Sequence, residues 1–400
     1  MANISNKAQQ MPASAIRKLV PFADAAKKEG VKVYHLNLGQ PDIKSPECAL
    51  DAIRNYSAVN ISYSHSGGLM ELRKGLVEKY YRKIGIDINV DELIVTVAGS
   101  ESVNLALEIA CDPGDEVLVL EPFYTNYNTF AFMNKLTLKA IATDIRNGFQ
   151  IPPIEEFEKA ITDKTKAILV CNPGNPTGTQ YSKESMLALG EIARKHDLFL
   201  LSDEVYREFC YTDEPHFSAM NIPGLEQNVV LIDSVSKRYS ECGIRIGALI
   251  TKNKALREAV MKFCQARLSP PLLGQVIAEA SIDAPRSYGI NTYEKYIERR
   301  NCLIDELNKL PGVYSPIPMG AFYTVARLPI DDSDKFCEWC LTDFQYEGET
   351  IMMAPASGFY SEEGYGKNEV RIAYAIDKQD LKRAIFLLGK ALEQYPGRVG

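Results

Sequence analysis

The sequence lacks several features that would place the protein in a specialised class. No apolar run approaches the ~18 residues of a membrane span, and no apolar segment follows a basic start, so we expect neither a membrane anchor nor a secretory signal. The four histidines show no metal-ligand spacing, so we expect no metal. Positive charge is not in excess: the formal net charge of −7 argues against a nucleic-acid or membrane-surface partner bound through a basic field.

The nine cysteines lack the even number and regular spacing of a disulfide framework. Cys337 and Cys340 form a lone CxxC with no second pair, so we expect two thiols near the apolar face of a helix and no zinc site. Reduced thiols are typical of the cytosol, and we therefore expect a cytoplasmic protein.

The composition is that of an ordinary globular protein, with 46% hydrophobic and 24% charged residues. A chain of 400 residues allows two domains or one large domain with a smaller companion. A core of that size needs no disulfide or metal to be stable.

The middle of the chain alternates apolar runs with helical patterns. Continuous Val/Ile/Leu runs separated by helices are typical of a mainly parallel sheet buried on both faces, which predicts an α/β fold. We expect a large domain over residues 46–285. Its expected strands are 93–97, 116–120, 166–171, 198–202, 229–233 and 246–251, and its clearest helices are 183–195, with Ser182 as N-cap, and a segment from 254 onward.

After about residue 285 the pattern changes. We expect a smaller, discontinuous α+β domain made of residues 1–45 and 286–400. It would contain a long helix over 286–310, strands near 322–325, 351–353 and 370–374, and helices near 334–344 and 378–393.

Polar residues follow the expected strands, where ligands of parallel sheets bind. Lys237 comes just after a buried run, and a desolvated lysine near a second cation, here Arg245, is a good amine nucleophile toward a carbonyl. Ser234, Ser236 and that arginine suit a phosphate. A phosphorylated aldehyde held as a Schiff base would satisfy all of these groups.

Further groups would suit a pyridine ring. Asp203 could keep a ring nitrogen protonated, Tyr206 could donate to a ring oxygen, and the rigid turn over 172–178 presents Asn175. Gly99, Ser100 and Glu101 open a helix, whose free N–H groups suit a phosphate.

The chain resembles the class I/II aminotransferases of the pyridoxal-phosphate fold-type-I superfamily, near the aspartate and aromatic aminotransferases. The resemblance covers nearly the whole chain, from Asn37-Leu-Gly39-Gln-Pro-Asp42 to Asn368-Glu-Val-Arg371-Ile-Ala, and the order of the motifs carries it. It implies a pyridoxal 5'-phosphate cofactor and a ping-pong transfer of an amino group from an L-amino acid to a 2-oxo acid. We favour aspartate and 2-oxoglutarate as the pair, with another dicarboxylic or an aromatic amino acid as the alternative donor.

The resemblance also implies a role for each matching residue. Lys237 would form the Schiff base and then shuttle a proton between Cα and C4′. Arg371 would grip the substrate α-carboxylate, helped by Asn175 and the Gly39 backbone. The groups around the cofactor would be Asp203 at the ring nitrogen, Tyr206 and Asn175 at the ring oxygen, Tyr124 stacked on the ring, and Ser100, the Glu101 backbone, Ser234 and Arg245 at the phosphate. Gly99 and Ser236, which adjoin these groups in the sequence, are also expected to bind the cofactor.

Tyr63 resembles the tyrosine that reaches the phosphate of the neighbouring subunit, which implies a homodimer with shared active sites. Arg267 lies in the segment where aspartate enzymes carry an arginine for the distal carboxylate of the substrate. A solvent-facing arginine is an alternative at that position.

Two residues depart from the family pattern. Glu241 stands where the lysine signature usually has an apolar residue, and Tyr124 stands where aspartate enzymes use tryptophan. Two alternatives to transamination stay open: a lyase or decarboxylase with the same cofactor, and a non-enzymatic regulator on the same fold. The negative charge and the start of family-like residues by Asn37 disfavour the regulator.

Overall fold

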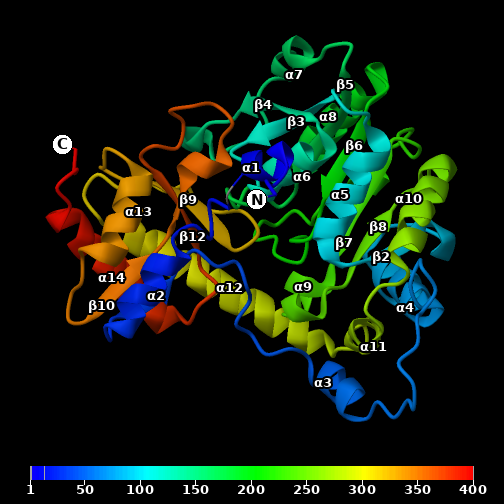
Figure 1. Cartoon of the computed structure of the whole chain (residues 1–400), viewed down its shortest axis with the longest axis horizontal. Coiled ribbons are helices and arrows are strands. Elements are labelled where there is room, and N and C mark those ends of the chain that lie inside the picture. The colour runs from blue at the N-terminus through cyan, green and yellow to red at the C-terminus, as the bar shows by residue number, and fades with distance from the viewer. Residues whose placement is uncertain (1, 13, 400) are drawn as a thin grey trace.

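The computed structural model describes residues 2–12 and 14–399, so residues 1, 13 and 400 of the predicted small domain lie outside it. The described strands form three sheets (Figure 1). The largest has seven strands, which in spatial order are β2 (Leu93–Thr96), β8 (Gly247–Ile250), β7 (Val229–Ser234), β6 (Phe199–Asp203), β5 (Thr165–Cys171), β3 (Glu116–Glu121) and β4 (Thr137–Ala142).

The large sheet is mainly parallel, as predicted. Only β8 runs against its neighbours, since it pairs antiparallel with both β2 and β7. A strand over 246–251 in a mainly parallel sheet was predicted without a direction, and the structure shows that this strand is antiparallel to both neighbours. The connection over 235–246 contains only the short helices α9 (Val235–Arg238) and η6 (Cys242–Ile244). It folds back without a crossover helix, so β8 returns antiparallel.

Each face of the large sheet is covered by helices. Successive strand residues belong to different cores: Leu200 to one face and Leu201 to the other. This explains the continuous apolar runs in the sequence. The first core includes α4 (Met70–Gly75), α7 (Ile154–Ala160), α8 (Lys183–Lys195) and α11 (Leu272–Ser281), and the second includes α5 (Ala98–Ala110), α6 (Asn126–Asn134) and α10 (Lys254–Arg267).

The two smaller sheets and their helices form a second region. Strand β1 (Lys32–His35) pairs in parallel with β10 (Glu349–Met352), so the N-terminal segment joins the C-terminal part of the chain. The other sheet has the order β11 (Ala354–Pro355), β12 (Glu369–Ala373) and β9 (Tyr323–Arg327). The helices here are α2 (Val20–Lys28), α12 (Arg286–Leu307), α13 (Ser333–Thr342) and α14 (Lys378–Gln394).

Two short helices lie apart from these cores. Helix α1 (Asn6–Gln10) lies near α6 (Figure 1), where Lys7 Nζ donates to Met133 O at 2.9 Å. Helix α3 (Glu47–Arg54) packs against α11. Cys337 and Cys340 are buried, unbridged thiols on α13, as predicted. Within residues 2–12 and 14–399, no helix is long and apolar enough to cross a membrane. The domain limits at 45/46 and 285/286 stay a prediction.

Candidate active site

The carboxyl ends of β5, β6 and β7 lie side by side at one edge of the large sheet. Cys171 pairs with Asp203, and Asp203 pairs with Ile232. The chain leaving β5 carries Asn175, and the chain leaving β7 carries Lys237. The predicted convergence of these groups at one sheet edge follows from this register.

Lys237 lies on α9, three residues beyond the end of β7. Its Nζ donates to Gly39 O at 2.8 Å and lies 3.6 Å from Cys242 Sγ. Burial lowers the pKa of the ammonium, and the charges of Arg245 and Arg371 lower it further against the opposing effect of Cys242. In the described part of the chain no carboxylate forms an ion pair with Lys237. This amine is suited to attack a carbonyl.

Asp203 is a buried carboxyl at the end of β6. Tyr127 OH donates to its Oδ2 at 2.7 Å, and Val205 N donates to its Oδ1 at 3.4 Å. Burial nevertheless raises its pKa to about 6. A cationic partner such as a protonated pyridine nitrogen would stabilise the carboxylate. Tyr127 was not singled out by the sequence, although it lies one helical turn after Tyr124 on α6.

A pair of phenols joins the two regions of the molecule. The hydroxyls of Tyr206 and Tyr323 lie 2.9 Å apart, and either can donate. Tyr323 OH also lies 3.5 Å from Gly39 O. A Cβ on Gly39 would lie 1.7 Å from Tyr323 OH, so only glycine fits there. Tyr323 was missed because the strand pattern over 322–325 does not show which side chain faces the site.

Arg371 on β12 is only 2% exposed. Its Nη1 donates to Asn175 Oδ1 at 3.1 Å and its Nη2 to Asn37 O at 2.5 Å. The guanidinium also lies 4.8 Å from the Tyr323 ring centre. Its Nε has no hydrogen-bond partner among the described residues, and burial lowers its pKa. A buried guanidinium without an acid is suited to an anionic ligand.

Three segments meet at the predicted phosphate end. Ser234 Oγ donates toward Ile246 O at 2.9 Å and lies 2.8 Å from Ser236 Oγ. A Cβ on Gly99, in the first turn of α5, would lie 3.8 Å from Ser234 Cβ, so this helix start adjoins the serines. Arg245 is exposed, in the left-handed backbone conformation with φ of 58°, and its Nη1 donates to Cys242 O at 2.8 Å.

The helix start at Ser100 is also where Arg267 is bound. Arg267 Nε donates to Glu101 Oε1 at 2.9 Å, and Val97 N donates to Glu101 Oε2 at 2.6 Å. The guanidinium of Arg267 is therefore held within its own chain. Its predicted contact with a distal carboxylate of the substrate stays a prediction.

Tyr124 and Tyr63 differ in burial and in their contacts. Tyr124 is partly buried, receives a hydrogen bond from Asn126 Nδ2 at 2.8 Å, and packs edge-on against Tyr127 with ring centres 5.5 Å apart. Tyr63 is 79% exposed and lies next to the exposed side chains of Val59 and Ile61. Within a single chain, Tyr63 does not complete the site.

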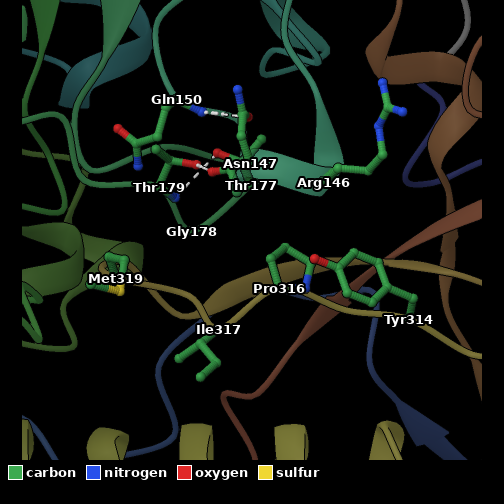
Figure 2. Close-up of a pocket in the computed structure, with 11 residues that line it drawn as sticks. Arg146, Asn147, Gln150, Thr177, Gly178, Thr179, Tyr314, Pro316, Ile317 and Met319 are labelled. Carbon is green, nitrogen blue, oxygen red and sulfur yellow. Dashed lines mark hydrogen bonds between the residues drawn. The ribbon is translucent and has the colours of Figure 1, made fainter.

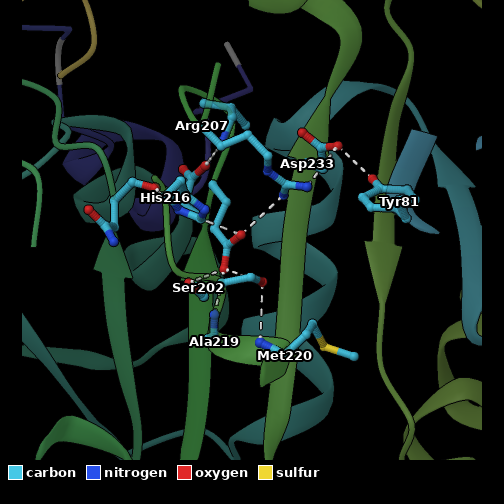
Figure 3. Close-up of polar contacts among 12 residues, drawn as sticks. Tyr81, Ser202, Arg207, His216, Ala219, Met220 and Asp233 are labelled. Atoms are coloured by element: carbon cyan, nitrogen blue, oxygen red, sulfur yellow. Dashed lines mark hydrogen bonds and ion pairs between the residues drawn. The ribbon is translucent and has the colours of Figure 1, made fainter. Parts of the chain in front are cut away.

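A buried ionic network contains Glu204 and Arg238, the chain neighbours of Asp203 and Lys237, and Figure 3 shows its members Tyr81, Arg207 and Asp233. Arg238 Nη2 donates to Asp233 Oδ2 at 2.6 Å, and Tyr81 OH donates to the same oxygen at 2.5 Å. Arg207 Nη2 lies 3.2 Å from Glu204 Oε2. Burial acts to raise the pKa of Asp233, but the two arginines more than offset it and hold that pKa below its usual value.

Two surface hollows lie away from the site. One of about 320 Å³ is bordered by residues 146–150 and 177–179 on one side and 314–319 on the other (Figure 2). A second, of about 530 Å³, adjoins it along 142–153. None of the predicted site residues lines either hollow.

The residues at the sheet edge fit a phosphorylated pyridine aldehyde. They supply a partly buried amine, a carboxyl that a cation would stabilise, a phenol pair and a guanidinium with a donor that is free among the described residues. Fold and site together are those of an aminotransferase, and the chain belongs to the class I and II aminotransferase family, whose sequence model matches residues 31–387. The recognition, the fold class and the enzyme class predicted from the sequence are thereby confirmed.

The relatives of this chain carry related names. It is 31% identical to an aspartate aminotransferase of Thermotoga maritima, over 96% of this chain and 97% of that protein. It is 30% identical to an aspartate/prephenate aminotransferase of Thermus thermophilus, over 98% and 99%. Among solved structures, an alanine aminotransferase from Pyrococcus furiosus superposes with a TM-score of 0.88 at 31% identity, over 98% of this chain and 100% of that one.

Proposed function

We propose that this aminotransferase binds pyridoxal 5'-phosphate at Lys237 and transfers the amino group of aspartate to 2-oxoglutarate by a ping-pong mechanism. One observation carries the proposal: the partly buried amine of Lys237 and the buried guanidinium of Arg371 lie in one site, and the described chain supplies neither with an acid. An amine nucleophile and a carboxylate-binding guanidinium are what an amino-acid substrate requires.

Each polar group then has a task. When bound, pyridoxal phosphate supplies an electron sink for the bond at the substrate Cα. Asp203 holds the proton on the ring nitrogen, while Tyr206 and Asn175 donate to the ring oxygen. Lys237, as a neutral amine, takes the proton from Cα, and Arg371 fixes the α-carboxylate so that this Cα lies within reach.

At the other end of the cofactor, the proposed phosphate contacts are Ser234, Ser236, Arg245 and the first turn of α5 at Gly99–Glu101. Backbone N–H groups at a helix start favour an anion. The partly buried Tyr124 is proposed to stack on the ring.

The choice of aspartate rests on the names of relatives, since several are aspartate aminotransferases. The alanine enzyme among the structural matches shows that this fold also serves other donors. Arg267 would have to give up its hydrogen bond to Glu101 before it could bind a distal carboxylate of the substrate. If Arg267→Leu leaves the ratio of aspartate to aromatic turnover unchanged, that role is excluded.

We also propose a homodimer with shared sites. Tyr63, Val59 and Ile61 form an exposed partly apolar strip, which a second copy would cover. Light scattering tests the dimer. Co-expression of Lys237→Ala and Tyr63→Phe chains tests the sharing, because mixed dimers would regain one intact site. A cytoplasmic location is supported by the nine unbridged cysteines.

The deciding experiment gives purified enzyme aspartate alone. A transaminase stops after one half-turnover and restarts when 2-oxoglutarate is added. A lyase or decarboxylase keeps turning over without an acceptor, and that outcome would replace transamination by the alternative chemistry. A panel of amino donors then ranks aspartate against alanine and aromatic amino acids.

A further inference from the structure

Glu241 lies in the turn that joins the lysine to the predicted phosphate arginine. Its backbone connects both ends of this turn: Glu241 N donates to Ser236 O at 3.0 Å, and Ile244 N donates to Glu241 O at 3.2 Å. A shift of Glu241 would therefore move Lys237 and Arg245 together. Nothing in the function described above uses the Glu241 side chain.

The side chain of Glu241 is buried against α11. It is only 4% exposed, and its Oε1 lies 2.5 Å from Ser281 Oγ. Its Oε2 has no hydrogen-bond partner in the part of the chain that the structure describes. Helix α11 packs tightly on the same turn, since a Cβ on Gly274 would lie 2.4 Å from Ile244 O.

The geometry around Ser281 favours a proton on Glu241. Ser281 Oγ lies 2.5 Å from Glu241 Oε1 and 2.9 Å from Ile277 O, and a hydroxyl has only one proton to donate. If the carboxyl carries a proton on Oε1, it donates to Ser281 Oγ, and that hydroxyl donates to Ile277 O. Both contacts are then satisfied, whereas an ionised Glu241 would compete with Ile277 for one proton.

The surroundings of Glu241 provide no compensating ion pair. The nearest cation is Arg238, whose Nε and Nη2 are bound by Glu208 and Asp233. The remaining titratable groups that face it are Tyr239, Tyr288 on α12 and Cys48 on α3. Burial raises the pKa of Glu241 to about 7, with the Ser281 contact and Arg238 acting against the rise.

We propose that Glu241 is a positioning residue held as a neutral acid, and that its proton fastens the turn from Lys237 to Arg245 onto α11 through Ser281. Once Glu241 is ionised, Ser281 has one proton for two acceptors, so either its contact with Glu241 or its contact with Ile277 O is lost. The turn is then held less firmly, so the protein loses stability and holds a ligand at Lys237 and Arg245 less tightly. The second consequence rests on the proposed cofactor; the first concerns the protein alone.

The test compares the wild type with Glu241→Gln at pH 6 and pH 8.5. Glutamine keeps the shape, donates from Nε2 to Ser281 Oγ and cannot ionise. We expect the melting temperatures of the two proteins to be closer at pH 6 than at pH 8.5, because most of the folded wild type still holds the proton at pH 6. At pH 8.5 we expect the wild type to melt at least ~2 °C lower than the variant and to bind pyridoxal phosphate ~5-fold or more weakly. Glu258→Gln, an exposed carboxylate on α10, is the matched control and should follow the wild type at both pH values.

Two further readouts keep the proposal open to failure if the glutamine variant folds poorly. Ser281→Ala removes the proton acceptor, so it should lower the melting temperature at pH 6 towards the wild-type value at pH 8.5. The infrared spectrum should show a protonated carboxylic acid at pH 6 that disappears by pH 8.5 and is missing in Glu241→Gln. Parallel pH profiles of wild type and Glu241→Gln, or no such band, would overturn the proposal. Melting and infrared readings on the cofactor-free protein stay informative even if pyridoxal phosphate does not bind.

Discussion

Two adjacent groups of charged side chains differ in whether the cations have acidic partners. Arg238 and Arg207 are matched by Asp233 and Glu204, and Figure 3 shows Arg207 and Asp233 in this network. One residue before Arg238, Lys237 has no acid, and across the site Arg371 has none among the described residues. The ion pairs hold three chain segments together, whereas Lys237 and Arg371 are suited to bind a ligand.

The pKa directions express the same contrast. Burial lowers the pKa of Lys237 and of Arg371, while the acids around Arg238 raise its pKa despite burial. An unpaired buried charge costs stability, so its presence indicates a functional demand. The difference therefore separates residues that serve the fold from residues that we propose serve catalysis.

The largest effect is expected at the unpaired amine. Lys237→Ala removes the nucleophile and proton carrier, so turnover should fall by at least ~10³-fold, and the visible absorbance of bound pyridoxal phosphate should disappear. Because a costly buried ammonium is also lost, the cofactor-free protein should melt at the same temperature or higher. A marked drop in melting temperature would show that Lys237 stabilises the fold, as the ion-paired Arg238 does, and the proposed difference between the two residues would be wrong.

Arg371→Leu should act on binding. We expect kcat/KM to fall ~10²- to 10³-fold, since a buried charge pair with the substrate α-carboxylate is lost. Unfolding in urea should change by no more than ~1 kcal/mol, because no acid is left unpaired. An equal loss for amino acids and for amines that lack a carboxylate would contradict this role.

The matched arginine should behave in the opposite way. Arg238→Met leaves Asp233 buried with weakened pairing, and we expect the free energy of unfolding to fall by ~3–5 kcal/mol. Arg194→Met, at an exposed pair with Glu191, is the control and should cost under ~1 kcal/mol. Urea denaturation of the cofactor-free proteins measures both. If both variants lost a similar free energy of unfolding, the buried ion pairs would contribute no more to stability than an exposed pair does.

Local patterns predicted the elements well, but not the partners of side chains. Ser182 was predicted to cap α8, and its Oγ does accept from Ser185 N at 3.2 Å, because a cap depends on neighbouring residues. Strand β4 was missed because it is a half-exposed edge strand without a continuous apolar run. The pairing of Arg267 with Glu101 joins residues far apart in sequence, so no local pattern encodes it.

The same limit applies within the site. The motifs located Lys237, Asp203 and Arg371, because residue type and position after a strand are properties of the sequence. Among the described residues Lys237 and Arg371 have no acidic partner, and this depends on how the two regions pack against each other. Glu241 was recognised only as a departure from a motif, and its contact with Ser281 on α11 required the structure.

The pH dependence of stability tests the role of Asp203, with a smaller expected effect. Its pKa is raised to about 6 from an ordinary value near 3.8, so the folded protein binds its proton more tightly than the unfolded chain does. Stability of the cofactor-free protein should therefore fall as pH rises from about 4 to about 6, by ~3 kcal/mol, and stay low above that window. Asp203→Asn should remove this dependence. Persistence of the slope in Asp203→Asn would assign it to another group.

The smallest effect is expected at the contact between the two regions. Tyr323→Phe deletes the hydroxyl that meets Tyr206 but keeps the ring beneath Arg371. One hydrogen bond is worth ~0.5–1.5 kcal/mol, so kcat should fall by less than ~10-fold with KM little changed. Tyr323→Leu also removes the ring face and should raise KM for the α-carboxylate. If both variants change kcat and KM alike, Tyr323 serves only packing, and the unmatched charge of Arg371 is held by Asn175 and Asn37 alone.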